Sequence, residues 1–173
     1  MAKELYLSGK ERVMADDEII VSKTNLKGHI TYGNDVFCNI ADYSTKEIIG
    51  APHSILRHPE MPRCIFKLFW ERIESGREIF AYVVNRGKEG DHYWVLAHVT
   101  PSFDANGKIT GYHSNRRKPT DAAVKAIKAL YATLLAEERK ASDRKTGLQN
   151  SYQRLHEILQ EKGVDYDEFV LAL

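Results

Sequence analysis

The chain has 173 residues, of which 43% are hydrophobic and 28% are charged, and its formal net charge at pH 7 is +1. This length supports one domain, or one domain with an extension, and the small charge predicts neither a nucleic-acid surface nor an acidic partner. Cys38 and Cys64 have no metal-binding or haem-attachment spacing and make no disulfide framework, which is typical of a reducing cytoplasm. The N-terminus lacks the apolar core of a signal peptide, and no uncharged stretch is long enough to span a bilayer. We therefore expect a cytoplasmic protein without a membrane segment.

The first part of the chain predicts a β-hairpin followed by short helices. Residues 1–17 have no clear period, and we expect either a short helix or a mobile lead there. The segments 19–21 and 29–32 predict two strands joined by a turn. Asn34 is a good N-cap residue for a first short helix, and Ser44 begins a capping box for a second.

The segment from Gly50 to Trp70 is irregular in its first half, because it contains three prolines within eleven residues. A regular helix is predicted only after Pro62, and it should end near Gly76. Two imidazoles and a guanidinium lie in the irregular half, on His53, Arg57 and His58. This cluster indicates a site, although a capped loop that leads into a core helix explains the local pattern equally well.

Three further strands are predicted at 79–85, 92–100 and 109–116, joined by short turns. Short links favour an antiparallel sheet, with the helices over one face and a pocket between the two layers. After Pro119 the composition changes, and three amphipathic helices are predicted. The charged segment 137–146, between the first two of them, is expected to have no side that faces the core.

The order of these elements matches the PAS fold, and several segments resemble the PAS domain of the bacterial aerotaxis receptor. The resemblance covers roughly residues 17–120, in the segments Ile30–Phe37, Leu56–Pro62, Asn85–Val95 and Gly107–Tyr112, in the helix ending at Trp70, and in Arg116 and Arg117. It implies an α+β protein with a five-stranded antiparallel sheet, short helices over one face and a C-terminal helical extension. The expected division is a lead at 1–17, a PAS sensor domain at 18–119 and the extension at 120–173.

In that family the pocket holds FAD non-covalently and reports redox state, so the resemblance implies a sensor of redox state or oxygen. The candidate cofactor-binding residues are Asn34, His53, Arg57, His58, Trp70 and Asn85. Arg57 suits a forked contact to a diphosphate or a flavin carbonyl. Trp70 offers a flat ring face, and Asn85 presents a donor and an acceptor together, as the pyrimidine edge of a flavin requires.

Each of these assignments has a structural alternative. Arg57 could pair with Glu60, Trp70 could be an ordinary core residue, and Asn34 could be only a helix cap. The family often places a tryptophan near the start of the third strand, where this chain has Ile79 and Phe80.

The chain is similar, more distantly, to light-sensing flavin PAS domains, in which a reactive cysteine follows a Gly-x-x pattern at the start of the same loop. Here Gly50-Ala-Pro is followed by His53, and Cys64 lies on the next helix. We therefore expect no light-driven thiol adduct.

Two other classes of function stay open: a haem-binding gas sensor, and a cofactor-free PAS module for interaction or dimerisation. The haem ligand would come from His53, His58, His92, His98 or His113. No phosphate loop, kinase signature or cyclase signature predicts an enzyme. The aerotaxis receptor continues into a membrane anchor and a signalling region, and we expect this chain to work without either. Its output should then pass through the C-terminal helices to a signalling partner or within a homodimer, without nucleic acid or membrane.

Overall fold

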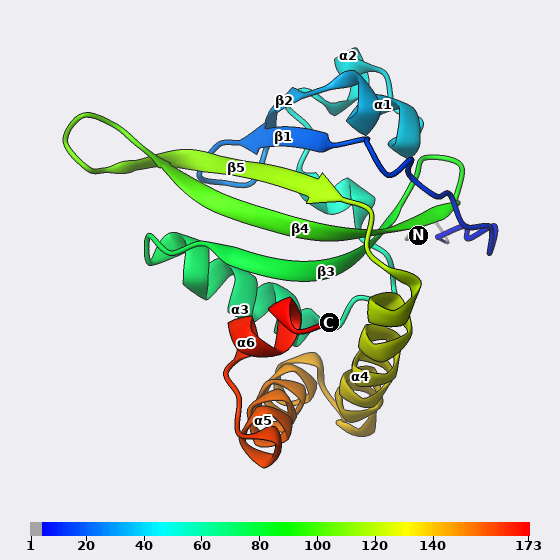
Figure 1. Cartoon of the computed structure of the whole chain (residues 1–173), viewed down its shortest axis with the longest axis vertical. Helices are drawn as coiled ribbons and strands as arrows, with labels where there is room; N and C mark the ends of the chain where they lie inside the picture. The colour runs from blue at the N-terminus through cyan, green and yellow to red at the C-terminus, as the bar shows by residue number, and fades with distance from the viewer. Residues whose placement is uncertain (1–4) are drawn as a thin grey trace.

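The computed structural model describes residues 5–173, which form one antiparallel sheet surrounded by helices (Figure 1). The strands are β1 (Ile20–Thr24), β2 (Ile30–Gly33), β3 (Ile79–Arg86), β4 (His92–Phe103) and β5 (Ile109–Arg117). The helices are α1 (Asp35–Ala41), α2 (Thr45–Ile48), the 3-10 helix η1 (His53–Leu56), α3 (Arg63–Glu74), α4 (Asp121–Lys140), α5 (Arg144–Lys162) and α6 (Tyr166–Leu171). The five strands lie in the order β2-β1-β5-β4-β3, so β5 is central and β2 and β3 form the edges. The predicted α+β fold is confirmed.

The starts of α1 and α2 follow the predicted capping residues. Asn34 accepts a hydrogen bond from the Phe37 amide at 3.1 Å and caps α1. Ser44 completes the predicted capping box of α2, and Thr120 caps α4 by accepting from the Ala123 amide at 3.1 Å. These boundaries are local properties of the sequence, which explains why they could be read from it.

In its described residues, the segment before β1 forms no helix, which was one of the two alternatives expected for it. It runs extended beside the start of β4, where the Arg12 amide donates to the His92 carbonyl at 2.8 Å. The Arg12 guanidinium also donates to Asp91 at 2.9 Å. Backbone N–H and C=O groups of this segment form hydrogen bonds with residues of the β3–β4 turn and the start of β4, in place of the hydrogen bonds that a helix would supply. Residues 1–4 of that prediction lie outside the described part of the chain.

The proline-rich loop between α2 and α3 is attached to both edges of the sheet. On the β2 side, the Gly50 amide donates to the Ile30 carbonyl at 2.7 Å, and the Ile30 amide donates to the Ala51 carbonyl at 2.9 Å. On the β3 side, Arg57 forms an isolated antiparallel bridge with Asn85. The loop therefore crosses one face of the sheet and helps to enclose the space between that face and α3.

The three C-terminal helices gather beside α3 at the β3 side of the sheet, whereas α1 and α2 lie at the β1–β2 side (Figure 1). The apolar stripes of α4, α5 and α6 are buried within the chain. Their buried residues are Ile127, Leu130, Tyr131, Leu134, Leu155, Leu159, Tyr166 and Val170. The Tyr131 hydroxyl donates to the backbone carbonyl of Tyr82 on β3 at 2.5 Å. Between residues 5 and 173, no helix is both long enough and apolar enough to cross a membrane.

The expectation that the charged segment 137–146 has no side facing the core is wrong, because of Glu138. Its side chain is only 6% exposed, and it accepts from the backbone amides of Arg63 at 2.7 Å and Cys64 at 3.3 Å. It also pairs with the Arg63 guanidinium at 2.8 Å. The N-cap residue of α3 is Pro62, which makes no side-chain cap. Glu138 of α4 therefore supplies the missing cap from a distant part of the sequence.

Candidate functional site: a buried cavity with an unpaired arginine

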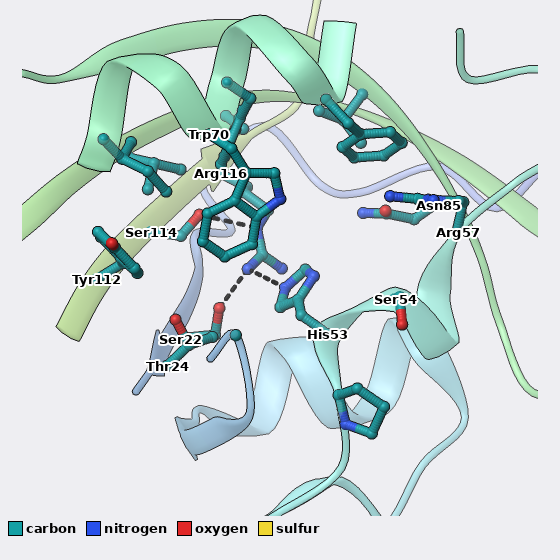
Figure 2. Close-up of a pocket in the computed structure, with 18 of the residues that line it drawn as sticks. Ser22, Thr24, His53, Ser54, Arg57, Trp70, Asn85, Tyr112, Ser114 and Arg116 are labelled. Carbon is teal, nitrogen blue, oxygen red and sulfur yellow. Dashed lines mark hydrogen bonds between the residues drawn. The ribbon is translucent and has the colours of Figure 1, made fainter. Parts of the chain in front are cut away.

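A cavity of about 230 Å³ lies between the sheet and α3 and is closed on one side by the proline-rich loop (Figure 2). Phe66, Phe69 and Trp70 from α3 line it with aromatic rings. The Trp70 ring meets Tyr112 of β5 edge to face, with ring centroids 5.7 Å apart. Gly28 lets the β1–β2 turn approach this ring, since its φ is +77° and a Cβ atom there would lie 3.2 Å from Trp70. The cavity thus has a broad aromatic wall.

The opposite wall carries a buried guanidinium, that of Arg116 on β5, which is only 3% exposed. Its Nε donates to Ser114 Oγ at 3.0 Å, and its Nη2 donates to Ser22 Oγ and to His53 Nε2, the latter at 2.9 Å (Figure 2). It also lies 5.0 Å from the centre of the Phe37 ring. Nη1 has no hydrogen-bond partner, and no carboxylate in residues 5–173 pairs with this arginine.

The protonation states in this cluster follow from burial. Burial, and then the charge of Arg116, lower the pKa of His53 to about 3, so its ring is neutral at neutral pH. Burial lowers the pKa of Arg116 to about 10, which leaves the guanidinium charged at neutral pH. Because arginine can only donate, His53 Nε2 is the acceptor in the bond between them. The cavity therefore holds one positive charge with a donor still available.

A second unsatisfied donor lies nearby on β3. Asn85 is 4% exposed and lines the cavity, and its Nδ2 has no hydrogen-bond partner in the described chain. The backbone bridge between Arg57 and Asn85 holds the loop at this point. The Arg57 guanidinium lies 4.1 Å from the centre of the Phe66 ring and makes no ion pair with Glu60. Burial, and then the charge of Arg144, lower the pKa of Arg57.

The structure brings four of the six predicted residues to the cavity: His53, Arg57, Trp70 and Asn85. His58 is buried next to it and lines a neighbouring cleft, where its Nδ1 accepts from the Glu60 amide at 3.2 Å. Asn34 is outside the lining of both spaces. Its amide side chain caps α1 and bonds to the backbone of β1, which is the structural alternative for this residue.

The sequence reasoning missed the polar wall formed by Arg116, Ser114 and Ser22. A signal for part of it was present, because Tyr112, Ser114 and Arg116 alternate along β5 and therefore share one face of the sheet. Ser22 could not be placed without the register, which sets it directly opposite Ser114.

The five-stranded antiparallel sheet, the loop that crosses it and α3 have the arrangement of a PAS-type domain. Residues 30–116 match the family model described as PAS fold, and the chain belongs to this family. The chain is 38% identical over 136 residues to the aerotaxis receptor of Escherichia coli (strain K12), a match that covers 79% of this chain and 27% of the receptor. The chain thus spans about a quarter of that relative.

Two solved structures support the fold. The dark structure of the blue-light photoreceptor Aureochrome1 LOV aligns with a TM-score of 0.56 and 24% identity, over 62% of this chain and 80% of that one. A light-oxygen-voltage domain studied with a flavin analogue aligns with a TM-score of 0.56 and 20% identity, over 71% of this chain and 87% of that one. At this level of identity the likeness concerns the fold alone.

Proposed function

We propose that this chain is a sensor that binds FAD non-covalently in the cavity and reports the redox state of the flavin. The observation that carries the proposal is Arg116, a buried guanidinium with an unused N–H and no carboxylate partner in the described chain. Burial of an uncompensated charge is costly, so a ligand that offers acceptors is expected there. The unpaired Nδ2 of Asn85 adds a second donor in the same cavity.

A flavin fits this set of residues because it combines a flat ring with carbonyl acceptors at one edge. Arg116 and Asn85 would hold the carbonyl edge, and Phe66, Phe69 and Trp70 would contact the ring. A bound flavin supplies reversible electron transfer, and the chain's own residues bind it, orient it and keep water from it. The resemblance to aerotaxis receptors supports FAD as the form that is bound.

The geometry around His53 favours flavin over haem. Of the histidines that the sequence offered as haem ligands, His53 lines the cavity, and its Nε2 already accepts a hydrogen bond from Arg116 at 2.9 Å. The Nε2 lone pair that would bind iron is therefore already used. Because the neutral ring carries its proton on the other nitrogen, Nδ1 offers no lone pair either. A flavin requires no histidine ligand.

The proposed output runs through the elements that border the cavity. α3 contributes the aromatic wall and is also bonded to the C-terminal helices, by Arg63 to Glu138 of α4 and by Arg72 to Asp167 of α6 at 2.6 Å. β5 carries Arg116 and leads into α4 within five residues. A change of charge on the flavin could therefore alter the packing of α4–α6, which would pass the signal to a partner protein or a second copy of the chain.

The test is an absorption spectrum of the purified protein, before and after incubation with excess FAD and removal of free ligand. We expect the two visible bands of an oxidised flavin, and complete release of FAD from the unfolded protein. A protein that stays colourless after reconstitution would contradict the proposal and favour a cofactor-free interaction module. A Soret band would favour a haem sensor.

A further inference from the structure

A second cleft adjoins the cavity on the side of the C-terminal helices. It has a volume of about 480 Å³ and shares Ser54 and Arg57 with the cavity, so the two spaces meet at these residues. Four guanidinium groups line it, on Arg57, Arg63, Arg139 and Arg144. They come from four separate places in the chain: the end of η1, the start of α3, the end of α4 and the start of α5. We refer to it as the arginine cleft.

The charge of the arginine cleft is only partly compensated. Among residues 5–173, Glu138 is the single carboxylate in its lining, and it is already paired with Arg63 at 2.8 Å. No carboxylate in residues 5–173 pairs with Arg57, Arg139 or Arg144. The nearby charge of Arg144 contributes to lowering the pKa of Arg57, which shows that these two groups repel each other.

The position of Arg144 within its helix also disfavours its positive charge. Arg139 lies in the last turn of α4, where a positive charge interacts favourably with the helix dipole. Arg144 lies in the first turn of α5, where the dipole disfavours a positive charge. Within the described part of the chain, three guanidinium groups without a carboxylate partner therefore line one open cleft, and that of Arg144 lies at an electrostatically unfavourable helix end. An anion bound among them would reduce the repulsion between the guanidinium groups and would also offset the unfavourable helix dipole at Arg144.

We propose that the arginine cleft binds the diphosphate of FAD, and that Arg139 and Arg144 are ligand-binding residues contributed by the C-terminal helices. This inference rests on the proposed flavin site. FAD joins its ring to adenosine through a sugar-alcohol chain and a diphosphate, so a molecule with its ring in the cavity would reach the arginine cleft past Arg57, where the two spaces adjoin. Guanidinium groups bind phosphate oxygens through paired N–H donors, which suits two linked phosphates contacted from different elements.

Two properties follow from this arrangement. The protein should prefer FAD to riboflavin, which has the same ring but no phosphate. The C-terminal helices should also sense occupancy directly, since α4 and α5 each supply a contact to the cofactor.

The experiment measures the dissociation constants of FAD and riboflavin by flavin fluorescence, for the full chain and for Arg139→Ala, Arg144→Ala and the double variant. Lys145→Ala is the matched control, because it removes the same charge from the neighbouring residue of α5, which is outside the lining of the cleft. We expect about tenfold weaker FAD binding for each single variant and up to about a hundredfold for the double variant. Riboflavin binding should not change, and Lys145→Ala should bind both ligands as the unmodified chain does.

The outcomes separate this inference from the flavin site itself. If the unmodified chain binds neither FAD nor riboflavin, the proposed function fails. If it binds both and the double variant binds FAD with unchanged affinity, only the arginine cleft is refuted. An equal loss of affinity for FAD and riboflavin in the double variant would also refute it, since the two arginines would then not act through the diphosphate. Arg144→Glu provides a second measurement: it should weaken FAD binding further, although its unfolding midpoint should be at least that of Arg144→Ala, because a negative charge is favourable in the first turn of α5.

Discussion

The environment of Arg116 differs from that of most buried arginines, which are paired with a carboxylate. Its partners are two serine hydroxyls, a neutral imidazole and an aromatic ring. Such neutral partners orient the guanidinium but do not cancel its charge. A residue held in this way is suited to a ligand whose negative charge varies, because the favourable interaction then grows as the ligand is reduced.

At this scale, His53 predicts a dependence of stability on pH in the flavin-free protein. Its folded-state pKa of about 3 lies below its ordinary value of 6.5, so the unfolded chain binds a proton that the folded chain does not. The contribution of His53 to the free energy of unfolding is therefore fully present above pH 6.5, and it is lost as the pH falls toward 3. Because part of the side chain is exposed, we expect this residue to account for about 1–2 kcal/mol between pH 7 and pH 5.

Urea unfolding at pH 7 and pH 5 measures this contribution, with His53→Gln as the comparison. The variant should lose less stability than the unmodified chain over this interval. An equal loss in both proteins would show that His53 titrates normally in the folded state.

Cys38 and Cys64 lead to a prediction about light. Both thiols are buried, and neither lines the cavity. Burial raises the pKa of the Cys64 thiol to about 11, which keeps it in the less reactive protonated form. Illumination of the FAD-loaded protein should therefore leave no covalent adduct in the spectrum. Reversible loss of the blue band that disappears in Cys64→Ser or Cys38→Ser would contradict this.

Among the elements, α3 links the cavity to the C-terminal helices because its two sides face different neighbours. Phe66, Phe69 and Trp70 face the cavity, whereas its N-terminus is capped by Glu138 of α4. A helix held in this way can transmit a small displacement, since the backbone amides that Glu138 caps and the aromatic side chains at the cavity belong to the same rigid helix.

Removal of the Glu138 cap should destabilise the protein markedly. Glu138→Ala leaves the Arg63 and Cys64 amides without an acceptor and the Arg63 guanidinium without its ion pair. We expect a loss of about 2–4 kcal/mol in the free energy of unfolding. Glu137→Ala is the matched control, because the Lys140 side chain with which it pairs is 67% exposed and the pair should contribute less than about 1 kcal/mol. Equal effects of the two variants in urea unfolding would disprove the capping role.

The same elements show what could and could not be predicted from the sequence. The caps at Asn34 and Ser44 were predictable, because a cap depends on residues within one helical turn. The role of Glu138 was not, because its partner Arg63 lies 75 residues away and the charged segment has no apolar pattern. Four candidate cavity residues followed from the resemblance to the aerotaxis receptor family, whereas Ser22 could be placed only from the strand register.

On the scale of the whole molecule, the C-terminal helices complete the fold rather than leave their apolar stripes exposed. Tyr131 packs near Trp94, with ring centroids 6.2 Å apart, on the sheet face opposite the cavity. Each large apolar side chain buried in this way contributes about 1.5–3 kcal/mol. A redox signal that altered this packing would therefore change the energy of a large interface.

This arrangement predicts a redox-dependent change in the C-terminal helices. Amide hydrogen exchange of the FAD-loaded protein should differ between the oxidised and the dithionite-reduced state from residue 119 onward. The flavin-free protein treated with dithionite is the control, and it should show no difference. Unchanged exchange in residues 119–173 of the loaded protein would make these helices a fixed structural cover.

The most direct measurement is a fluorescence titration of FAD with the full chain and with Arg116→Met, which keeps the length of the side chain but removes its charge. We expect one FAD per chain, and binding that is about tenfold to a hundredfold weaker in the variant. The flavin-free variant should be at least as stable as the unmodified chain, because it no longer buries an unpaired charge. Failure of the unmodified chain to bind FAD, or equal affinity in the two proteins, would contradict a flavin site built around Arg116.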